Sequence, residues 1–337
     1  MNLSVPSCAC VLCLGVCLAV GCRSEHSAQA EPPPTVSLSD ETPTPSPQPS
    51  VSAQQPSSGG AEHTPTAVST VERDRYAWLD EWEGELPKMT RLEARFPAPK
   101  GFTRIALAPE SFGTWLRGLP VRLDRTQVMS YRQEPLSSPA EAVVVLDVGE
   151  RDLQQCADSA LRLHAEFLWA SGRAKEARYH FTSGDPSSWV RWVRGERFRP
   201  KGNTVEAVMG KRRAETHAVF RSYLQHLFRY AGTRSLQFDS TAVPVQEHLM
   251  PGDFMVQPGG PGHAVVILDV AQNASGERVA LIGQGFMPAQ EFHVVYGDAR
   301  VAQDRVWFRL APPGDPEATL STPSWRPFER RDARRFK

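Results

Sequence analysis

The sequence predicts an α+β fold in which helices pack on a mainly antiparallel sheet. Two amphipathic helices are expected first, over residues 153–170 and 215–230, because their apolar residues recur at helical spacing. A series of short apolar runs separated by turn residues then fills the C-terminal part of the chain. Helices followed by adjacent strands are typical of the α+β class rather than of alternating α/β folds.

The strands before the first helix are expected where apolar patterning is strongest. Polar and apolar residues alternate over residues 102–107, and a short strand is expected at 121–123. The continuous apolar run at 142–148 predicts a buried strand. Residues 149–152 then turn the chain into the first helix, and Gly172 is placed to end it.

The strands after the second helix are expected at residues 253–257, 264–270, 279–284, 292–296 and 305–309. The turn residues between the second and third of these strands predict a hairpin. The chain closes on a basic segment, residues 330–337, which we expect to be a solvated tail.

The first 72 residues do not belong to this fold. The apolar run from Cys8 to Gly21 has the length of a signal-peptide core, and Leu18-Ala19-Val20-Gly21-Cys22 resembles a lipobox in which Cys22 is lipidated. Residues 1–22 are therefore predicted to be a lipoprotein signal peptide. Residues 23–72, rich in Pro, Ser and Thr, are predicted to be a disordered tether, and residues 73–337 a single globular domain.

This organisation predicts a protein of the bacterial cell envelope. The lipid anchor would hold it at a membrane, with the outer membrane facing the periplasm expected first and secretion as the alternative. Thirty-eight Lys and Arg residues balance 38 Asp and Glu residues, so no nucleic-acid partner is expected. The expected partners are the membrane, through the anchor, and a peptidoglycan peptide or another envelope protein. The histidines show no metal-binding spacing, so no metal or other cofactor is predicted.

Cys156 is the candidate nucleophile because every other cysteine lies in the leader. It opens the first helix, where unpaired amides and the positive end of the helix dipole stabilise a thiolate. His263 is the candidate general base, since it begins an apolar strand after the glycine-rich entry Gly259-Gly260-Pro261-Gly262. The alternative is structural: a lone cysteine on a helix is more often a small buried core residue.

Gln284 is the candidate third group, which would orient the histidine ring. It ends the strand expected to pair with that of His263. Asp269 is less favoured because, although it shares a strand face with His263, about 20 Å separates them. Gln155, next to Cys156, is a candidate donor to an oxyanion. Asp158, Arg162 and Glu166 recur every four residues and predict ordinary ion pairs along one helix face.

Several phrases of the sequence resemble a bacterial lipoprotein family known as domain of unknown function 4846, over residues 77–328. The resemblance implies a shared fold and no established activity. The phrases that carry it include Asp152-Leu153-Gln154-Gln155-Cys156-Ala157-Asp158, Gly252-Asp253-Phe254, Pro261-Gly262-His263-Ala264-Val265, Gln284-Gly285-Phe286-Met287-Pro288-Ala289-Gln290-Glu291-Phe292-His293 and Thr322-Pro323-Ser324-Trp325.

A fainter resemblance is to the NlpC-type and CHAP-type papain-like cysteine peptidases, which cut peptidoglycan stem peptides. Cys156 is similar to their nucleophile, and the strand that starts at His263 is similar to their histidine strand. This resemblance implies a papain-like arrangement of helices and sheet. The chain departs from those families at Gln155, where they usually have aspartate, and at Gln284, where they have histidine, asparagine or an acidic residue.

Two functions follow as hypotheses. The first is an envelope-anchored papain-like cysteine amidase or peptidase acting on cell-wall peptides, with Cys156, His263 and Gln284 as the catalytic residues. The alternative is a non-catalytic envelope lipoprotein that binds a cell-wall or protein ligand on the same scaffold. Residues 287–290 would then form a ligand-facing loop rather than a rigid connection.

Overall fold

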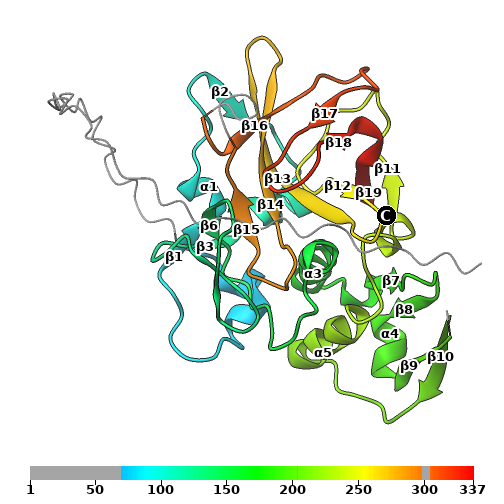
Figure 1. Cartoon of the computed structure of the whole chain (residues 1–337). Helices are drawn as coiled ribbons and strands as arrows, with labels where there is room; N and C mark the ends of the chain where they lie inside the picture. Colours follow the sequence, from blue (N-terminus) through cyan, green and yellow to red (C-terminus); the bar gives the residue numbers. More distant parts are fainter. Residues whose placement is uncertain (1–69, 203, 298–303) are drawn as a thin grey trace, which may run out of the picture. The chain divides into compact units, whose positions relative to one another are not determined.

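The computed structural model describes residues 70–202, 204–297 and 304–337 (Figure 1). It has a mixed α+β fold that is mostly β, with a few helices and a large antiparallel sheet. The predicted signal peptide, with Cys22, and nearly all of the predicted tether lie outside the described residues. Within the described part of the chain, no helix combines the length and apolar character needed to cross a membrane.

Nine of the described strands form one sheet in which neighbouring strands run antiparallel. Its path is β11–β19–β12–β13–β14–β15–β6, with β2 added to β13 and β16 added to β14. The strands are β2 (Phe102–Arg104), β6 (Ala140–Val143), β11 (Ser240–Ala242), β12 (Phe254–Gln257), β13 (His263–Asn273), β14 (Arg278–Gln284), β15 (His293–Val295), β16 (Trp307–Leu310) and β19 (Ala333–Phe336).

Ten further strands pair two by two outside this sheet. The pairs are β1 (Met89–Arg91) with β3 (Pro120–Arg122), β4 (Val128–Met129) with β5 (Pro135–Leu136), β7 (Arg178–His180) with β8 (Pro186–Ser188), β9 (Glu196–Lys201) with β10 (Thr204–Met209), and β17 (Thr319–Leu320) with β18 (Phe328–Glu329).

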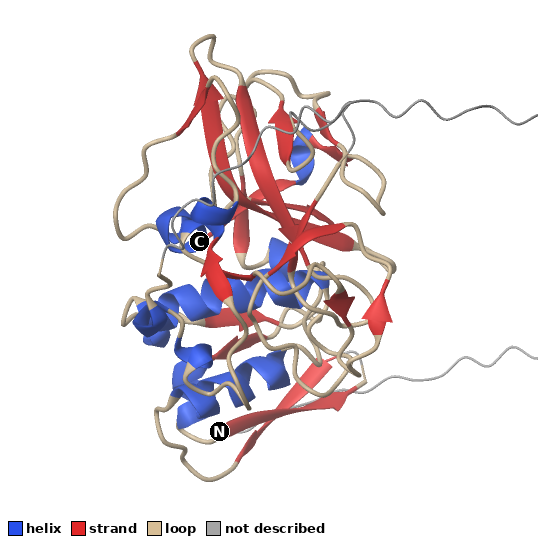
Figure 2. Cartoon of the chain, turned by 90° about the vertical axis from the view of Figure 1, so that its left-hand side faces the viewer, coloured by secondary structure: helices blue, strands red, loops and turns tan. Residues whose placement is uncertain are grey.

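The helices gather towards one end of the long strands, and the β13–β14 hairpin extends away from them (Figures 1 and 2). The α-helices are α1 (Leu92–Arg95), α2 (Phe112–Arg117), α3 (Cys156–Ala170), α4 (Trp189–Val193) and α5 (His217–Leu227). Short 3-10 helices are η1 (Arg73–Arg75), η2 (Ala77–Leu79), η3 (Ala174–Glu176), η4 (Ser235–Gln237) and η5 (Arg330–Asp332).

Helix α3 begins three residues later than the sequence predicted. Its first turn starts at Cys156, and the Asp158 carboxylate accepts the Gln155 amide at 3.3 Å, which caps the N-terminus. Gln155 takes an extended backbone conformation, so the helix starts after it, and the Gln154 side chain donates to the Asp147 carbonyl. The predicted end is confirmed: the helix stops at Ala170, and Gly172 takes the left-handed conformation (φ 70°) that favours glycine.

Strand β13 separates two apolar clusters because its successive side chains point to opposite faces of the sheet. Ala264 and Val266 join the larger cluster, which also holds the buried side of α3. Val265 and Ile267 join the second cluster, together with Phe328. This alternation fixes the surroundings of the two candidate catalytic residues.

Two strands predicted before α3 are shorter than expected. The strand predicted at 102–107 ends at Arg104, whose guanidinium is drawn to a buried carboxylate. The run predicted at 142–148 gives β6 (Ala140–Val143), after which the chain leaves β15. The Val145 amide donates instead to the Pro120 carbonyl at 2.8 Å. Both differences arise because tertiary contacts outweigh local apolar patterning.

The expectation of a solvated basic tail at residues 330–337 is wrong. Residues Ala333–Phe336 form β19, which lies between β11 and β12 in the central sheet. The Arg335 guanidinium pairs with the buried Asp253 carboxylate at 2.6 Å. Charged residues enter the sheet here because their charges have partners.

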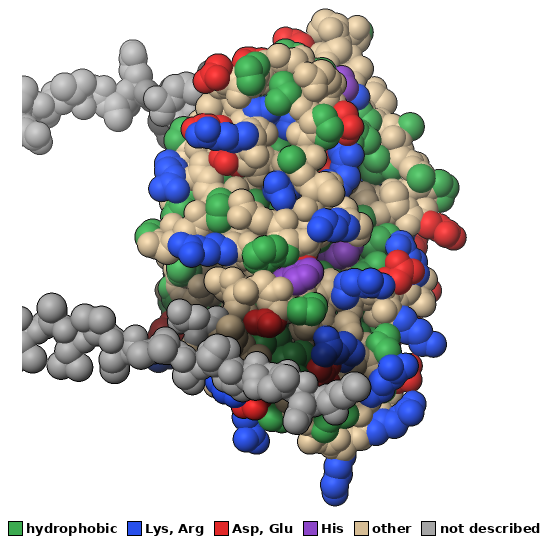
Figure 3. Space-filling model, turned by 90° about the vertical axis from the view of Figure 1, so that its right-hand side faces the viewer, with side chains coloured by type: hydrophobic (Ala, Val, Ile, Leu, Met, Phe, Trp, Pro, Cys, Tyr) green, Lys and Arg blue, Asp and Glu red, His purple; other side chains and the backbone are tan. Residues whose placement is uncertain are grey.

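Acidic and basic side chains are interspersed on the face seen in Figure 3, as the equal numbers of the two in the sequence would lead one to expect.

Candidate functional site

Cys156 lies at the N-terminus of α3, against the beginning of β13. Its side chain is buried, and the Sγ atom donates a hydrogen bond to the Gly262 carbonyl at 4.0 Å. The backbone amide of Ala264 also acts on the thiol and lowers its pKa. The thiol therefore meets the peptide groups on both sides of His263. Glycine is required at 262, because a Cβ there would lie 2.3 Å from the Thr233 hydroxyl and 2.7 Å from the Gln257 carbonyl.

Burial raises the pKa of the Cys156 thiol to about 11. The hydrogen bond from Ala264 acts in the opposite direction, and the neighbouring Asp158 carboxyl adds to the increase. The thiol is thus protonated at neutral pH in this conformation. Its chemistry as a nucleophile depends on a base that can take the proton.

His263 is fully buried at the first position of β13. Its ring packs among aromatic side chains, with centroid distances of 4.9 Å to Phe286, 5.0 Å to Trp325 and 6.0 Å to Phe328. Trp325 is held in place because its indole N–H donates to Gln257 Oε1 at 3.0 Å. These rings keep water away from the imidazole, which strengthens its remaining hydrogen bond.

A buried chain of hydrogen bonds joins His263, Gln284 and His293. His263 Nε2 lies 2.9 Å from Gln284 Oε1, and Gln284 Nε2 lies 3.3 Å from His293 Nε2. The far end is anchored by His293 Nδ1, which lies 3.0 Å from the Glu291 carbonyl oxygen. Gln284 and His293 face one another because they are paired across β14 and β15.

The Glu291 carbonyl at the far end determines which group donates in each hydrogen bond between these three side chains. A carbonyl oxygen can only accept, so His293 Nδ1 carries the proton and its Nε2 accepts from the Gln284 amide. Gln284 then presents its oxygen to His263, which must donate from Nε2. His263 is thereby held in the tautomer whose Nδ1 has a free lone pair. That Nδ1 atom is buried and has no hydrogen-bond partner among the described residues.

Both histidines are neutral in the fold. Burial lowers the pKa of His263 to about 4, although the hydrogen bond with Gln284 partly opposes the shift. Burial likewise lowers the pKa of His293 to about 4. His263 therefore remains a free base across the neutral and mildly acidic range.

We expect His263 and His293 to titrate near pH 4 rather than at the ordinary 6.5. Because folding lowers these pKa values, neutral rings stabilise the fold above pH 6.5, and this contribution is lost as the pH falls towards 4. The measurement is an NMR titration of the histidine ring Cε1 signals, assigned with single His→Gln variants. The urea-unfolded chain is the control, and a folded-state midpoint near 6.5 for both rings would contradict the prediction.

The structure brings Gln284 to His263, but it contains no hydrogen bond between Cys156 and His263. The thiol donates to the Gly262 carbonyl, whereas His263 Nδ1 has no hydrogen-bond partner in the part of the chain that the structure describes. Gln155, the candidate oxyanion donor, instead donates its side-chain amide to Asp152 at 2.9 Å.

Sequence reasoning missed two residues of this site, His293 and Trp325. The strands containing Gln284 and His293 were both predicted, and their pairing across the sheet was the signal that could have identified His293. Trp325 comes from a loop that no local pattern connects with His263. Its approach to the ring is decided by the tertiary structure alone.

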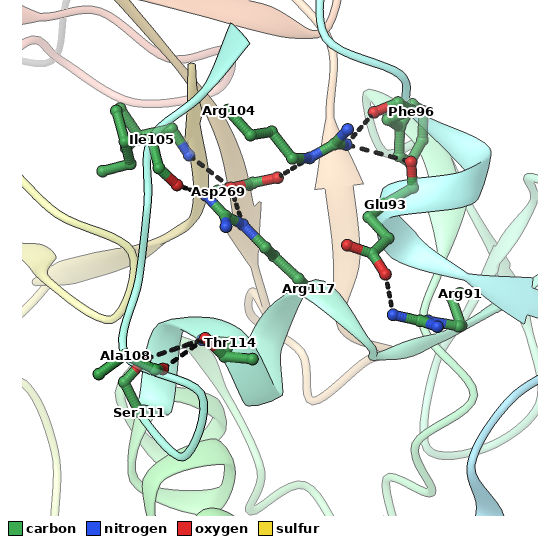
Figure 4. Close-up of polar contacts among 11 residues, drawn as sticks. Arg91, Glu93, Phe96, Arg104, Ile105, Ala108, Ser111, Thr114, Arg117 and Asp269 are labelled. Atoms are coloured by element: carbon green, nitrogen blue, oxygen red, sulfur yellow. Dashed lines mark hydrogen bonds and ion pairs between the residues drawn. The ribbon is translucent and has the colours of Figure 1, made fainter. Parts of the chain in front are cut away.

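Asp269, the less favoured third group, lies in a separate cluster (Figure 4). Its fully buried carboxylate pairs with Arg104 of β2 and Arg117 of α2, each at 2.6 Å. Arg117 also donates to the Ile105 carbonyl at 2.8 Å. The cluster thus joins three elements of the fold, and its carboxylate is fully occupied.

The expectation of ordinary ion pairs along α3 is only partly right. Arg162 pairs with Glu166 at 2.6 Å, but both side chains are buried rather than at the surface. Asp158 makes no such pair and serves as the helix cap. Within the described residues no group of three or more His, Cys, Asp or Glu side chains is arranged to hold a metal ion.

Fold and site together define a class: a mostly β α+β protein in which a buried histidine–glutamine–histidine chain lies beside a cysteine that opens a helix. The chain belongs to the family described as Domain of unknown function (4846), which matches residues 92–335. No curated protein and no solved structure gives a significant match.

Proposed function

We propose that the protein is an envelope-anchored papain-like cysteine amidase or peptidase that acts on cell-wall peptides. Cys156 is the nucleophile and His263 the general base in this proposal, and Gln284 is the positioning residue that holds the imidazole. The observation that carries the proposal is the free lone pair on His263 Nδ1, which the hydrogen bond with Gln284 fixes. The peptide groups on both sides of His263 also lie against the Cys156 thiol.

The proposed acylation begins when the thiol leaves the Gly262 carbonyl. Its proton passes to His263 Nδ1 as Sγ forms a bond with the scissile carbonyl carbon. The developing oxyanion is stabilised by backbone amides in the first turn of α3 and by the positive end of its dipole. The C–N bond then breaks, and the proton on Nδ1 passes to the leaving amine.

Deacylation uses the same base. Water gives a proton to His263 Nδ1 as its oxygen attacks the thioester carbon, and the C–S bond breaks. The carboxylic acid product leaves, and the proton on Nδ1 returns to the Cys156 sulfur. Because burial lowers the pKa of His263 to about 4, the ring stays unprotonated in mildly acidic surroundings, but the same shift makes it a weaker base toward the thiol.

The substrate class rests on the expected location and on the resemblance to peptidases that cut stem peptides. In the proposal, lipid on Cys22 anchors the protein in the cell envelope, and the Pro- and Ser-rich residues 23–72 give the domain its reach to the cell wall. Envelope peptides are the amide substrates available there.

One observation favours a second function, that of a non-catalytic envelope lipoprotein which binds a cell-wall or protein ligand. Cys156 is 5% exposed with the pKa of its thiol raised to about 11, and His263 is fully buried beneath aromatic rings. In that case Cys156 would be a small core residue, and the hydrogen-bond chain would only stabilise the sheet.

Iodoacetamide labelling of the folded, full-length protein separates the two functions. Trypsin releases Cys156 in the peptide of residues 152–162, which has no other cysteine, so mass spectrometry reports this thiol alone. At pH 7.5 we expect measurable labelling that falls about tenfold or more in His263→Gln, because the base that removes the thiol proton is lost.

His248→Gln is the matched control, since His248 is a partly exposed residue outside the chain of hydrogen bonds, and its labelling rate should equal that of the wild type. Equal rates in the wild type and His263→Gln would contradict the assignment of His263 as the base. A thiol that remains unlabelled until urea unfolds the protein would favour the non-catalytic function.

A further inference from the structure

Two residues that contact the candidate base also line a cavity of about 210 Å³. One is Gln284, whose Oε1 lies 2.9 Å from His263 Nε2. The other is Phe286, whose ring centroid lies 4.9 Å from that of His263. Ser324, which precedes the Trp325 that packs on the imidazole, lines the cavity too. The cavity therefore lies beside the residues that hold and cover the candidate base.

The same wall is linked to the beginning of α3. A Cβ at Gly285 would lie 2.4 Å from the Ser159 hydroxyl, so glycine lets this segment pack on the first turn of the helix. Four residues later, the Ala289 amide donates to Asp152 Oδ1 at 2.7 Å, in the turn that leads into α3. Residues 284–290 therefore run from the partner of the candidate base to the turn before the cysteine helix.

A second segment of the wall, residues 136–139, is held against the first. The Tyr131 amide, at the start of the turn between β4 and β5, donates to the Ala289 carbonyl at 2.9 Å. The Ser138 hydroxyl donates to Gln290 Oε1 at 3.5 Å. Because hydrogen bonds fix both segments, the cavity is formed before any ligand arrives, and binding needs little ordering of the chain.

The described residues that line the cavity are all uncharged. Serine hydroxyls and glutamine amides alternate with apolar side chains, among them Phe286 and Met287. Met287 is 39% exposed, so a ligand can reach it from solvent. Hydroxyl groups both donate and accept, as the N–H and C=O groups of a peptide require. A charged side chain would instead lose its hydration here without meeting a counter-charge.

Four charged residues lie within two positions of a wall residue in the sequence, and none of them lines the cavity. Glu134 is exposed, so solvent screens its charge. The other three interact with other side chains: Glu291 with Arg125 at 2.6 Å, Glu141 with Arg305 at 2.8 Å, and Arg326 with Gln257 at 2.6 Å. The neighbouring charges therefore do not change the neutral character of the wall.

The volume restricts the ligand to part of a longer chain. Sites that enclose a whole drug-sized molecule measure roughly 300–1,000 Å³. At about 210 Å³ this cavity is smaller, so it can hold only a short section of a ligand. A small residue of a peptide, with its flanking peptide groups, fits both this size and the neutral wall.

We propose that this cavity is a substrate subsite of the candidate active site and takes a small uncharged residue of a peptide. Serine hydroxyls of the wall bond to the backbone of the peptide, and its side chain lies against Phe286 and Met287. The inference rests on the proposed function, since it names the part of the substrate that the same site selects. Residues 287–290 then face the ligand rather than serving only as a connection.

The test is an NMR titration of the full-length Cys156→Ser protein, in which the weaker nucleophile slows turnover, with labelled methionine methyl groups. The probes are tri-alanine, tri-lysine and tri-glutamate, each acetylated and amidated so that only side chains are charged. We expect tri-alanine to shift the Met287 methyl signal, with a Kd in the millimolar range because the contacts are few. Tri-lysine and tri-glutamate should bind at least about tenfold more weakly. The Met287 signal is the one missing from Met287→Leu.

The same titration tests whether the cavity belongs to the candidate site. Gln284 and Phe286 contact the His263 ring and also line the cavity, so the His263 Cε1 signal should shift with the same Kd as the Met287 methyl signal. His248 is the control, because it is partly exposed and does not line the cavity, and its signal should stay in place.

Ser324→Asp tests the importance of the neutral wall. Ser324 is exposed and has φ 67°, a conformation that aspartate and asparagine tolerate better than most residues. The new carboxylate should strengthen tri-lysine binding about fivefold or more and weaken tri-glutamate. Ser324→Asn, the uncharged control of the same shape, should change each Kd by less than about threefold. Ser137→Asp, at an exposed wall position, gives the same comparison if Ser324→Asp does not fold.

Four results would overturn the subsite: equal binding of the three peptides, no shift of the Met287 methyl signal, a Met287 shift without one at His263, or equal effects of Ser324→Asn and Ser324→Asp on tri-lysine. These measurements need no reactive thiol, and the iodoacetamide labelling of Cys156 needs no peptide. Failure of the subsite can therefore be distinguished from failure of the proposed function.

Discussion

A Cys156→Ala protein is expected to lose cell-wall peptide cleavage by at least about a thousandfold, because the nucleophile of a covalent mechanism is removed. The assay is release of soluble muropeptides from purified peptidoglycan, followed by chromatography and mass spectrometry. Cys156→Ser tests the same point with almost no change in volume. Its hydroxyl is a far weaker nucleophile, and it can still donate to the Gly262 carbonyl.

The control for this experiment is stability. Cys156 is buried, so each variant must show a urea-unfolding midpoint close to that of the wild type before its activity is compared. A correctly folded Cys156→Ala protein that releases muropeptides at the wild-type rate would end the nucleophile assignment. Activity lost only in proportion to lost folded protein would assign Cys156 to the core.

Asp269→Asn is expected to destabilise the domain by about 3–5 kcal/mol, the usual cost of removing one member of a buried ion pair. The carboxylate is fully buried and is the partner of both Arg104 and Arg117 (Figure 4). Without it, two guanidiniums that lie mostly out of water lose their shared counter-charge. The free energy of unfolding, measured with urea, checks this value.

Asp80→Asn is the matched control, because it removes the same charge from an exposed pair with Arg73. Exposed pairs contribute at most about 1 kcal/mol. Equal losses for Asp269→Asn and Asp80→Asn would contradict a structural role for Asp269. Loss of catalytic activity without loss of stability would reopen its place as the third group of the site.

Local patterning was sufficient to predict the neighbours of His263 within the sheet. Gln284 ends a strand joined to that of His263 by a short turn, so the antiparallel pairing that follows the turn brings the two residues together. The end of α3 at Gly172 was predictable for the same reason, since helix termination is decided within one turn.

The environment of the two candidate catalytic residues was not predictable in this way. Burial of His263 requires Trp325 and Phe328, which lie more than 60 residues further along the chain, and burial of Cys156 depends on the close approach of α3 to Gly262. The sequence around a lone cysteine does not indicate how exposed its side chain is or what pKa its thiol has. Both properties are sums over many contacts distant in the chain.

The C-terminal segment illustrates the same limit. Its basic residues predicted a solvated tail, yet β19 pairs with β11 and β12 because Asp253 supplies a buried counter-charge to Arg335. No pattern within residues 330–337 indicates that partner.

The sequence by itself determined an α+β fold, the start of the histidine strand and the pairing that places Gln284 beside His263. Only the tertiary structure decided which His263 nitrogen is free, which side chains exclude water from the ring, and that the neighbouring thiol is protonated. The reason is that hydrogen-bond direction and desolvation depend on groups that the chain brings together only when it folds.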